Sequence, residues 1–261
     1  MRVRVRFTKL GKVRWTSHRD VARMWERAFR RVRVPLAYTG GFSPRPKVSF
    51  GLALPTGHES QAEYLDFEVQ EGATVEVEGL PARLSPALPT GVDAVAAAAV
   101  DERAPSLQED VTSCTWRIEV PDLGPAHAGE LVSAVIAADE LVVTRTRKGR
   151  EVTDDLRPAI LALTVIGPTE RGTELEAELA VHPRSVRPAE LLLALSPGLE
   201  EGRVVRTAQW IWRDGARLEP LLAEPDATAC PAREDPDVRR SSVAPAERTD
   251  QPAPAGVATG G

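Results

Sequence analysis

The sequence predicts an α+β protein of two tandem ferredoxin-like domains, each with the order βαββαβ plus an extra strand, and a disordered C-terminal tail. The length of 261 residues suits two compact units. The same succession of strand-like and helix-like segments occurs twice, and a helical segment of the first half is similar to one of the second. The predicted units are a basic domain at 1–100, a linker at 101–113, a second domain at 114–218 and the tail at 219–261.

The chain begins with an alternating pattern in residues 2–7. Valine and phenylalanine at odd positions predict the buried face of a strand, and arginine at even positions predicts a solvated face. That solvated face would carry Arg2, Arg4 and Arg6. After a turn at 9–12, we expect Val13 and Trp15 to return to the buried side, with Arg14 pointing outward.

A helix is predicted over residues 18–33. Ser17 is a favourable N-cap, and Asp20 stands where a capping-box carboxylate can return to the backbone. Apolar residues at a spacing of three and four predict one buried stripe, and Pro35 ends the pattern. The opposite, solvated face carries Arg19, Arg23, Arg27, Arg30 and Arg31.

The first domain continues with short strand patterns and a final helix. We expect strands at 35–39, 47–54, 64–69 and 92–100, and a helix at 81–88. Between the first two of these strands lies a loop at 40–47 with two glycines and two prolines. It would display Gly41, Phe42, Arg45 and Lys47, either to bind a partner or as an ordinary turn.

The second domain repeats this order. Strands are expected at 116–120, 141–147, 159–166, 174–181 and 204–212, with helices at 129–138 and 188–195. The eleven-residue segments that begin at Pro81 and Pro188 share six identities, which favours a tandem duplication. From 219 onward there are seven prolines, nine alanines and no aromatic residue, a composition that cannot support a packed core.

Charge is distributed unevenly along the chain. The net charge is −5, but residues 1–50 hold 14 basic and 2 acidic side chains, a local charge of +12. A folded basic region of this kind can meet a polyanion, and arginine offers phosphate a planar fork of donors. Of the 33 basic residues 29 are arginine, as GC-rich coding would also produce, so arginine placement carries more weight than arginine number.

Several classes of protein are excluded by composition. No segment is long and apolar enough to span a membrane, and the N-terminus lacks the apolar block of a secretory signal, so we expect a cytoplasmic protein without membrane contact. Cys114 and Cys230 are the only cysteines, far apart in the sequence. They form neither a disulfide framework nor a metal motif and cannot hold an iron–sulfur cluster, so no cofactor is expected.

The basic positions define the candidate binding surface. A second basic group lies at a hairpin-like connection in 145–150, where Asp155 is expected to brace Arg157. A solvated charged face or turn is the alternative interpretation of both groups. The candidate residues for contact with RNA or a protein partner are Arg2, Arg4, Arg6, Arg14, His18, Arg19, Arg23, Gly41, Phe42, Arg45, Lys47, Arg145, Arg147, Lys148 and Arg157.

His18 is the one candidate for catalysis. A histidine can abstract the proton of a 2′-hydroxyl and so cleave RNA without a metal. No partner for it is identifiable in the sequence, and a structural role in the first helical turn is the alternative. The other histidines have no neighbours at metal-ligand spacing.

Two segments of the first half resemble a known family. Residues 7–20, FTKLGKVRWTSHRD, and residues 41–50, GFSPRPKVSF, are similar to the radical-SAM-associated proteins, a domain of unknown function that occurs fused to or beside B12-binding radical SAM proteins. The similarity covers roughly residues 2–212. It implies a radical SAM partner that carries the cluster chemistry this chain lacks, and it supplies no mechanism.

Three functions stay open at this point. The first is an accessory protein without catalysis of its own that binds RNA or presents it to a radical SAM partner during RNA modification. The second is a metal-free ferredoxin-like endoribonuclease that uses His18, an analogy with bacterial immunity endonucleases that depends on topology. The third is a protein-binding scaffold that does not contact nucleic acid.

Overall fold

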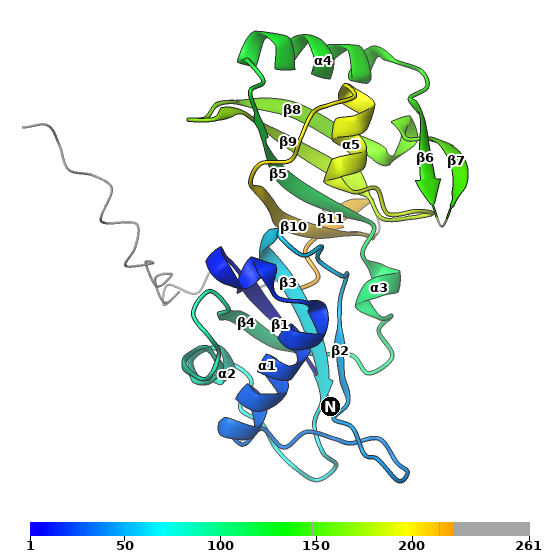
Figure 1. Ribbon diagram of the computed structural model, residues 1–261. Helices are drawn as coiled ribbons and strands as arrows, with labels where there is room; N and C mark the ends of the chain where they lie inside the picture. The colour runs from blue at the N-terminus through cyan, green and yellow to red at the C-terminus, as the bar shows by residue number, and fades with distance from the viewer. Residues whose placement is uncertain (148, 214, 222–261) are drawn as a thin grey trace, which may run out of the picture. The chain divides into compact units, whose positions relative to one another are not determined.

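A large, mostly antiparallel sheet organises the computed structural model, which describes residues 1–147, 149–213 and 215–221 (Figure 1). Seven strands follow one another in the order β4-β1-β3-β10-β5-β9-β8, while β2 pairs with β3 and β11 with β10. Helices are few, and the fold class is mixed α+β, as predicted.

The first half contributes β1 (Arg2–Lys9), the 3-10 helix η1 (Gly11–Trp15), α1 (His18–Arg31), β2 (Val48–Phe50), β3 (Glu59–Glu68), α2 (Leu80–Leu84), η2 (Ser85–Ala87) and β4 (Ala94–Val100). The second half contributes α3 (Leu107–Asp110), β5 (Ser113–Pro121), α4 (Pro125–Ala137), β6 (Val142–Arg147), β7 (Arg150–Asp155), η3 (Arg157–Ala159), β8 (Ile160–Pro168), β9 (Gly172–Ala180), α5 (Pro188–Leu195), β10 (Val204–Arg213) and β11 (Ala216–Leu218).

Both halves order their strands in the same way. In the first, β1 lies between β4 and β3, and β2 pairs with the other side of β3; in the second, β5 lies between β10 and β9, and β8 lies beyond β9. The halves meet where β10 pairs in parallel with the start of β3, Val205 opposite Glu59 and Arg206 opposite Ser60. The second half also inserts the β6–β7 hairpin, and the sequence pattern did not predict β7.

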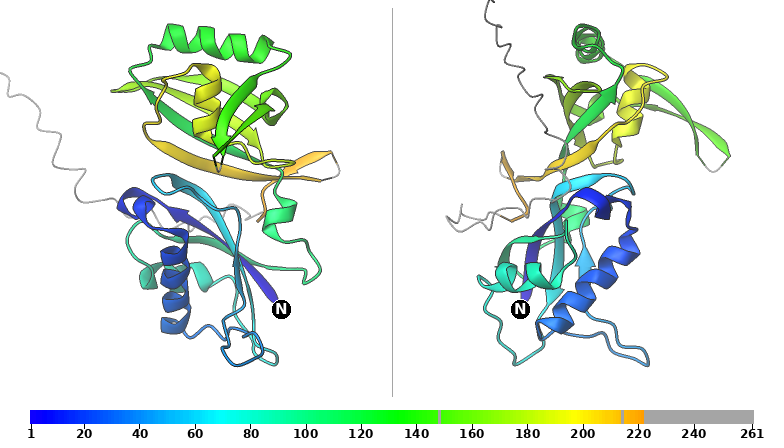
Figure 2. Two further views of the ribbon diagram at one scale, coloured as in Figure 1. Left: turned by 45° about the vertical axis from the view of Figure 1, so that its right-hand side comes forward. Right: turned by 60° about the vertical axis from the view of Figure 1, so that its left-hand side comes forward.

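Each half has its own hydrophobic core. Figures 1 and 2 show the helices of each half beside its part of the sheet. In the first half, β1 and β3 pack against α1 and α2 through Val5, Leu65, Trp25 and Leu84. In the second half, β5 and β9 pack against α4 and α5. The predicted boundaries between two domains stay a prediction, since the separate cores share one continuous sheet.

The first helix forms as predicted. The side chain of Ser17 accepts a hydrogen bond from the backbone N–H of Asp20, and the stripe that includes Val21, Trp25 and Phe29 is buried. The segment before it differs from the prediction, because η1 replaces the expected return to a strand. The indole of Trp15 is 65% exposed, packs on Gly57 and does not enter the core.

Two predicted irregular segments contain packed residues. Residues 101–113, expected to be a plain linker, include α3, whose Leu107 is buried. The fold was expected to end at 218, yet Glu219 to Leu221 lie against the first half and Leu221 is buried. The rest of the predicted tail, 222–261, lies outside the described residues. No helix that the structure describes combines the length and the apolar character needed to cross a membrane.

Candidate nucleic-acid interface and junction pocket

The β1 arginine row, Arg2, Arg4 and Arg6, is not the solvated face that the alternation predicted. The side chain of Arg4 is 4% exposed and forms a two-fold hydrogen bond with Asp66 of β3, at 2.8 and 2.9 Å. Arg2 donates to the backbone oxygen of Ala104 at 2.9 Å. The central guanidinium of this row, that of Arg4, is therefore already bound by a carboxylate on the neighbouring strand.

The chain after β11 covers the same face. Glu219 accepts a hydrogen bond from Arg6 at 2.7 Å, and the backbone oxygen of Pro220 accepts one from Arg4 at 3.1 Å. Leu221 is buried in a small apolar cluster that also contains Tyr64. Because burial disfavours the phenolate, the pKa of Tyr64 is raised far above its usual range. The predicted open sheet face is thus closed by the protein itself.

The α1 arginine row, Arg19, Arg23, Arg27, Arg30 and Arg31, lies on the outer face of its helix as predicted, and all five side chains are exposed. Within the described residues, only Arg23 of this row has an ion pair, with Asp20 at 3.4 Å. Arg27 and Arg30 donate to backbone oxygens one turn earlier. The row therefore keeps guanidinium donors available to an external anion.

The loop at 40–47 forms a narrow hairpin-like excursion. Tyr38 bridges to Pro46, and the backbone N–H of Thr39 donates to the backbone oxygen of Arg45. Gly41 has a φ of 105°, a conformation that favours glycine. The side chains of Phe42, Arg45 and Lys47 are all exposed, as predicted, and Lys47 forms a surface ion pair with Glu68 at 2.6 Å.

The basic group of the second half separates into two parts. Arg145 and Arg147 lie on β6, and Lys148 lies outside the described residues. Arg157 is a structural residue, because its guanidinium donates to the backbone oxygens of Ile136, Ala138 and Ile160 and so closes the end of α4. Asp155 accepts from the backbone N–H of Arg157 and does not pair with its side chain.

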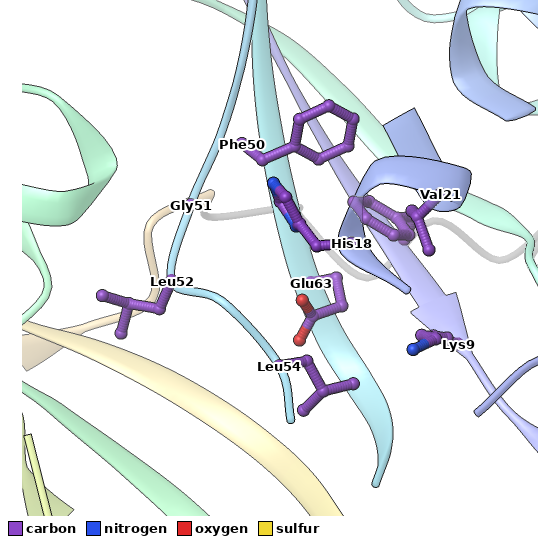
Figure 3. A pocket seen from close by; sticks show the side chains of 9 residues that line it. Lys9, His18, Val21, Phe50, Gly51, Leu52, Leu54 and Glu63 are labelled. Carbon is purple, nitrogen blue, oxygen red and sulfur yellow. The ribbon is translucent and has the colours of Figure 1, made fainter. Parts of the chain in front are cut away.

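A small pocket, which we call the junction pocket, opens beside the N-terminus of α1, near the meeting point of β3 and β10 (Figure 3). His18 lies at its mouth with its ring 5.2 Å from that of Phe50 in an edge-to-face arrangement. The carboxylate of Glu63 points into it (Figure 3). Its lining residues are Phe7, Lys9, His18, Val21, Phe50, Gly51, Leu52, Leu54 and Glu63.

Charged side chains are buried around this pocket. Oε1 of Glu63 lies 3.5 Å from Nε of Arg206, whose side chain is fully buried over the ring of Trp116. Arg206 also donates to the backbone oxygens of residues 52 and 53, which fixes the loop that forms one wall. Burial lowers the pKa of Lys9, the negative charge of Glu63 opposes this, and the positive charge of Arg206 adds to it.

A second buried carboxylate, that of Glu59, links three segments of the chain near the pocket. It accepts hydrogen bonds from the backbone of Gly11 and from Arg203, at 2.7 and 2.6 Å, and pairs with Arg14 at 3.4 Å. Arg14, predicted to face a ligand, is therefore half-buried and engaged within the protein. Nearby, His58 approaches Glu201 at 3.1 Å.

Sequence reasoning found His18 but missed Lys9, Glu63 and Arg206. A usable signal was present for Glu63, which stands at an inward position of a strand otherwise filled by apolar residues at Leu65 and Phe67. The approach of Arg206 needed the pairing of β10 with β3, which no local pattern predicts.

Metal ligands and reactive thiols do not define this site. No three His, Cys, Asp or Glu side chains in the described residues are placed to hold a metal ion. Cys114 is buried in the second core, and burial raises the pKa of its thiol to about 11, so it stays protonated at neutral pH. Cys230 lies outside the described part of the chain.

Fold and site together define a mixed α+β protein with an exposed arginine-bearing helix that begins at a pocket of buried charges. A family model described as "uncharacterized protein conserved in bacteria", DUF2344, matches residues 2–193, and the chain belongs to this family. The description names no activity. No curated protein matches the chain.

Proposed function

We propose that this chain is a cytoplasmic accessory protein that binds RNA through the α1 arginine row and presents it to a radical SAM partner. The observation that carries the proposal is the row itself: five exposed guanidinium groups on one face of one helix, of which only Arg23 pairs with a carboxylate among the described residues. Such a row can track a phosphate backbone, because each guanidinium offers a fork of donors to phosphate oxygens.

The surface differs from the one that the sequence favoured. The β1 arginine row does not bind RNA in this proposal, because Asp66 and the segment at 219–221 already bind its guanidinium groups. Phe42 and Arg45 on the loop at 40–47 stay in the proposal, because both are exposed and can add a stacking ring and a further cation.

The radical SAM partner is supported by the family resemblance of residues 7–20 and 41–50. These two segments also supply four lining residues of the junction pocket, Phe7, Lys9, His18 and Phe50. A partner that binds this region would contact both the pocket and the start of α1. Affinity purification of the full chain from its native cell should recover a radical SAM protein with RNA; recovery of a partner without RNA would favour a protein scaffold.

We further propose that each half is a ferredoxin-like unit and that the two arose by duplication. The support is the shared strand order, in which β1 lies between β4 and β3 and β5 lies between β10 and β9. The segments that begin at Pro81 and Pro188 coincide with the first turns of α2 and α5, the helices that precede β4 and β10.

The binding proposal is tested by charge reversal on α1. Arg19→Glu with Arg27→Glu should weaken binding of single-stranded RNA about tenfold or more. It should also make the slope of log affinity against log salt shallower by about 0.7 for each phosphate that the variant no longer neutralises. Arg103→Glu with Arg171→Glu changes the net charge equally at exposed sites elsewhere and serves as the control. Equally weakened binding in both variants, or unchanged binding in the α1 variant, would refute this surface.

A second candidate, cleavage of RNA with His18 as general base, is favoured by one observation. His18 is exposed at the mouth of a pocket that also contains Lys9 and Glu63, so titratable groups converge there. Cleavage that persists in chelator and disappears in His18→Ala would establish it. Intact RNA after prolonged incubation with the wild-type protein would exclude it.

A further inference from the structure

The junction pocket holds a carboxylate with unused hydrogen-bonding capacity. The side chain of Glu63 is 10% exposed, and no described residue donates a hydrogen bond to its buried Oε1. Its ion pair with Arg206 at 3.5 Å neutralises the charge but is too long for a good hydrogen bond. A buried acceptor in this state gains most from a ligand that donates N–H groups.

A donor with spare capacity lines the same pocket. The ammonium group of Lys9 donates to the backbone oxygens of Arg14 and Thr16, at 3.3 and 3.0 Å. An ammonium has three donors, so one is left for a further acceptor. The pocket therefore combines two carboxylate oxygens that can accept with one ammonium that can donate.

Protein groups already hold the buried charges of the pocket. Glu63 pairs with Arg206, and two backbone oxygens accept from the ammonium of Lys9, so a neutral ligand can bind without leaving a charged group without a partner. The walls are apolar, with Phe7, Val21 and Leu54, and the mouth is aromatic. Apolar walls, an aromatic mouth and a polar interior suit a planar heterocycle that presents several hydrogen-bonding groups on one edge.

The room inside limits how the ligand enters. The interior holds about one water molecule, so only the edge of a ring can enter while the ring itself stays outside, against Phe50. His18 is exposed and has no hydrogen bond to a described residue, so its ring can turn outward and stack on the ligand. The backbone of residues 52 and 53 is held by Arg206, which keeps the opposite wall in place.

We propose that the junction pocket captures one unstacked guanine of a bound RNA. Its N1–H and N2–H would donate to the two oxygens of Glu63, and its O6 would accept from Lys9. Among the four RNA bases, guanine alone presents two adjacent donors beside an acceptor on its Watson–Crick edge. Uracil, adenine and cytosine would each set an acceptor against one carboxylate oxygen. This inference rests on the proposed function, since α1 begins at the pocket and would hold the flanking phosphates.

The test compares the affinity of the full-length protein for RNAs that differ in a single base. A short single-stranded RNA with one central guanine should bind at least about tenfold more tightly than the same RNA with adenine, cytosine or uracil there, measured by fluorescence anisotropy. Glu63→Gln replaces an acceptor by a donor and should abolish the preference. Glu219→Gln, a partly buried carboxylate away from the pocket, is the control and should keep it.

The outcomes separate this inference from the proposed function. Equal affinity for all four bases, with binding still dependent on Arg19 and Arg27, would overturn the guanine pocket and leave the RNA surface standing. Binding of guanosine monophosphate without any RNA binding would support the guanine pocket and refute the RNA surface. If Glu63→Gln does not fold, the comparison of the four bases in the wild-type protein still decides.

Discussion

The two arginine rows of the first half have similar compositions but differ in burial and in ion pairing. On β1 the arginines face Asp66 on the neighbouring strand and lie under Glu219, so the central guanidinium is bonded and buried. On α1 they face solvent, and only Arg23 is paired within the described residues. Arginine periodicity alone therefore does not identify a ligand surface; the partners that the fold brings opposite each row decide which one can bind an external anion.

The difference has a physical origin in the two kinds of element. A strand lies between two neighbours, so a carboxylate on the next strand is within reach of each outward side chain. The outer face of a surface helix has neighbours only three and four residues away along its own sequence. On α1 those positions supply only Asp20 and Glu26 as acidic residues.

The largest effect is expected at the pair of Arg4 and Asp66. Asp66→Ala leaves a buried guanidinium without its carboxylate and should lower the free energy of unfolding by about 3–5 kcal/mol, measured by chemical denaturation. Arg27→Ala on the other row should change it by no more than about 0.5 kcal/mol. Similar effects of the two substitutions would mean that the rows do not differ as described.

An intermediate effect is expected from alkaline titration of Tyr64. Its raised pKa means that above pH 10 the unfolded chain releases a proton that the folded chain keeps, so stability falls as the pH rises. Tyr38→Phe leaves Tyr64 as the single tyrosine, so phenolate absorbance then reports this residue alone. Ionisation should coincide with unfolding; ionisation near pH 10 in a folded protein would show that the face is open.

The smallest effect is expected at Glu219. Because this carboxylate and Arg6 are both partly exposed, Glu219→Gln should cost no more than about 1 kcal/mol in thermal or chemical unfolding. Its affinity for RNA should match that of the wild type. A clear gain in RNA affinity would indicate that the β1 arginine row can be uncovered and takes part in binding.

Local patterns predicted much of the fold and little of the site. The period of two in β1 and the buried stripe of α1 come from sequence neighbours, and both elements form as expected. The pairing of Arg4 with Asp66 spans 62 residues and that of Arg6 with Glu219 spans 213, so no window of sequence could reveal them. The same limit hid the convergence of Lys9, Glu63 and Arg206.

Ultraviolet crosslinking of the full chain to a short RNA, followed by mass spectrometry of the linked peptides, tests the central claim most directly. The RNA-binding surface is α1 with the junction pocket, so crosslinks should map to residues 18–31 and to Phe50, and should weaken in Arg19→Glu with Arg27→Glu. Crosslinks concentrated on β1, or on the second half without α1, would contradict the assignment.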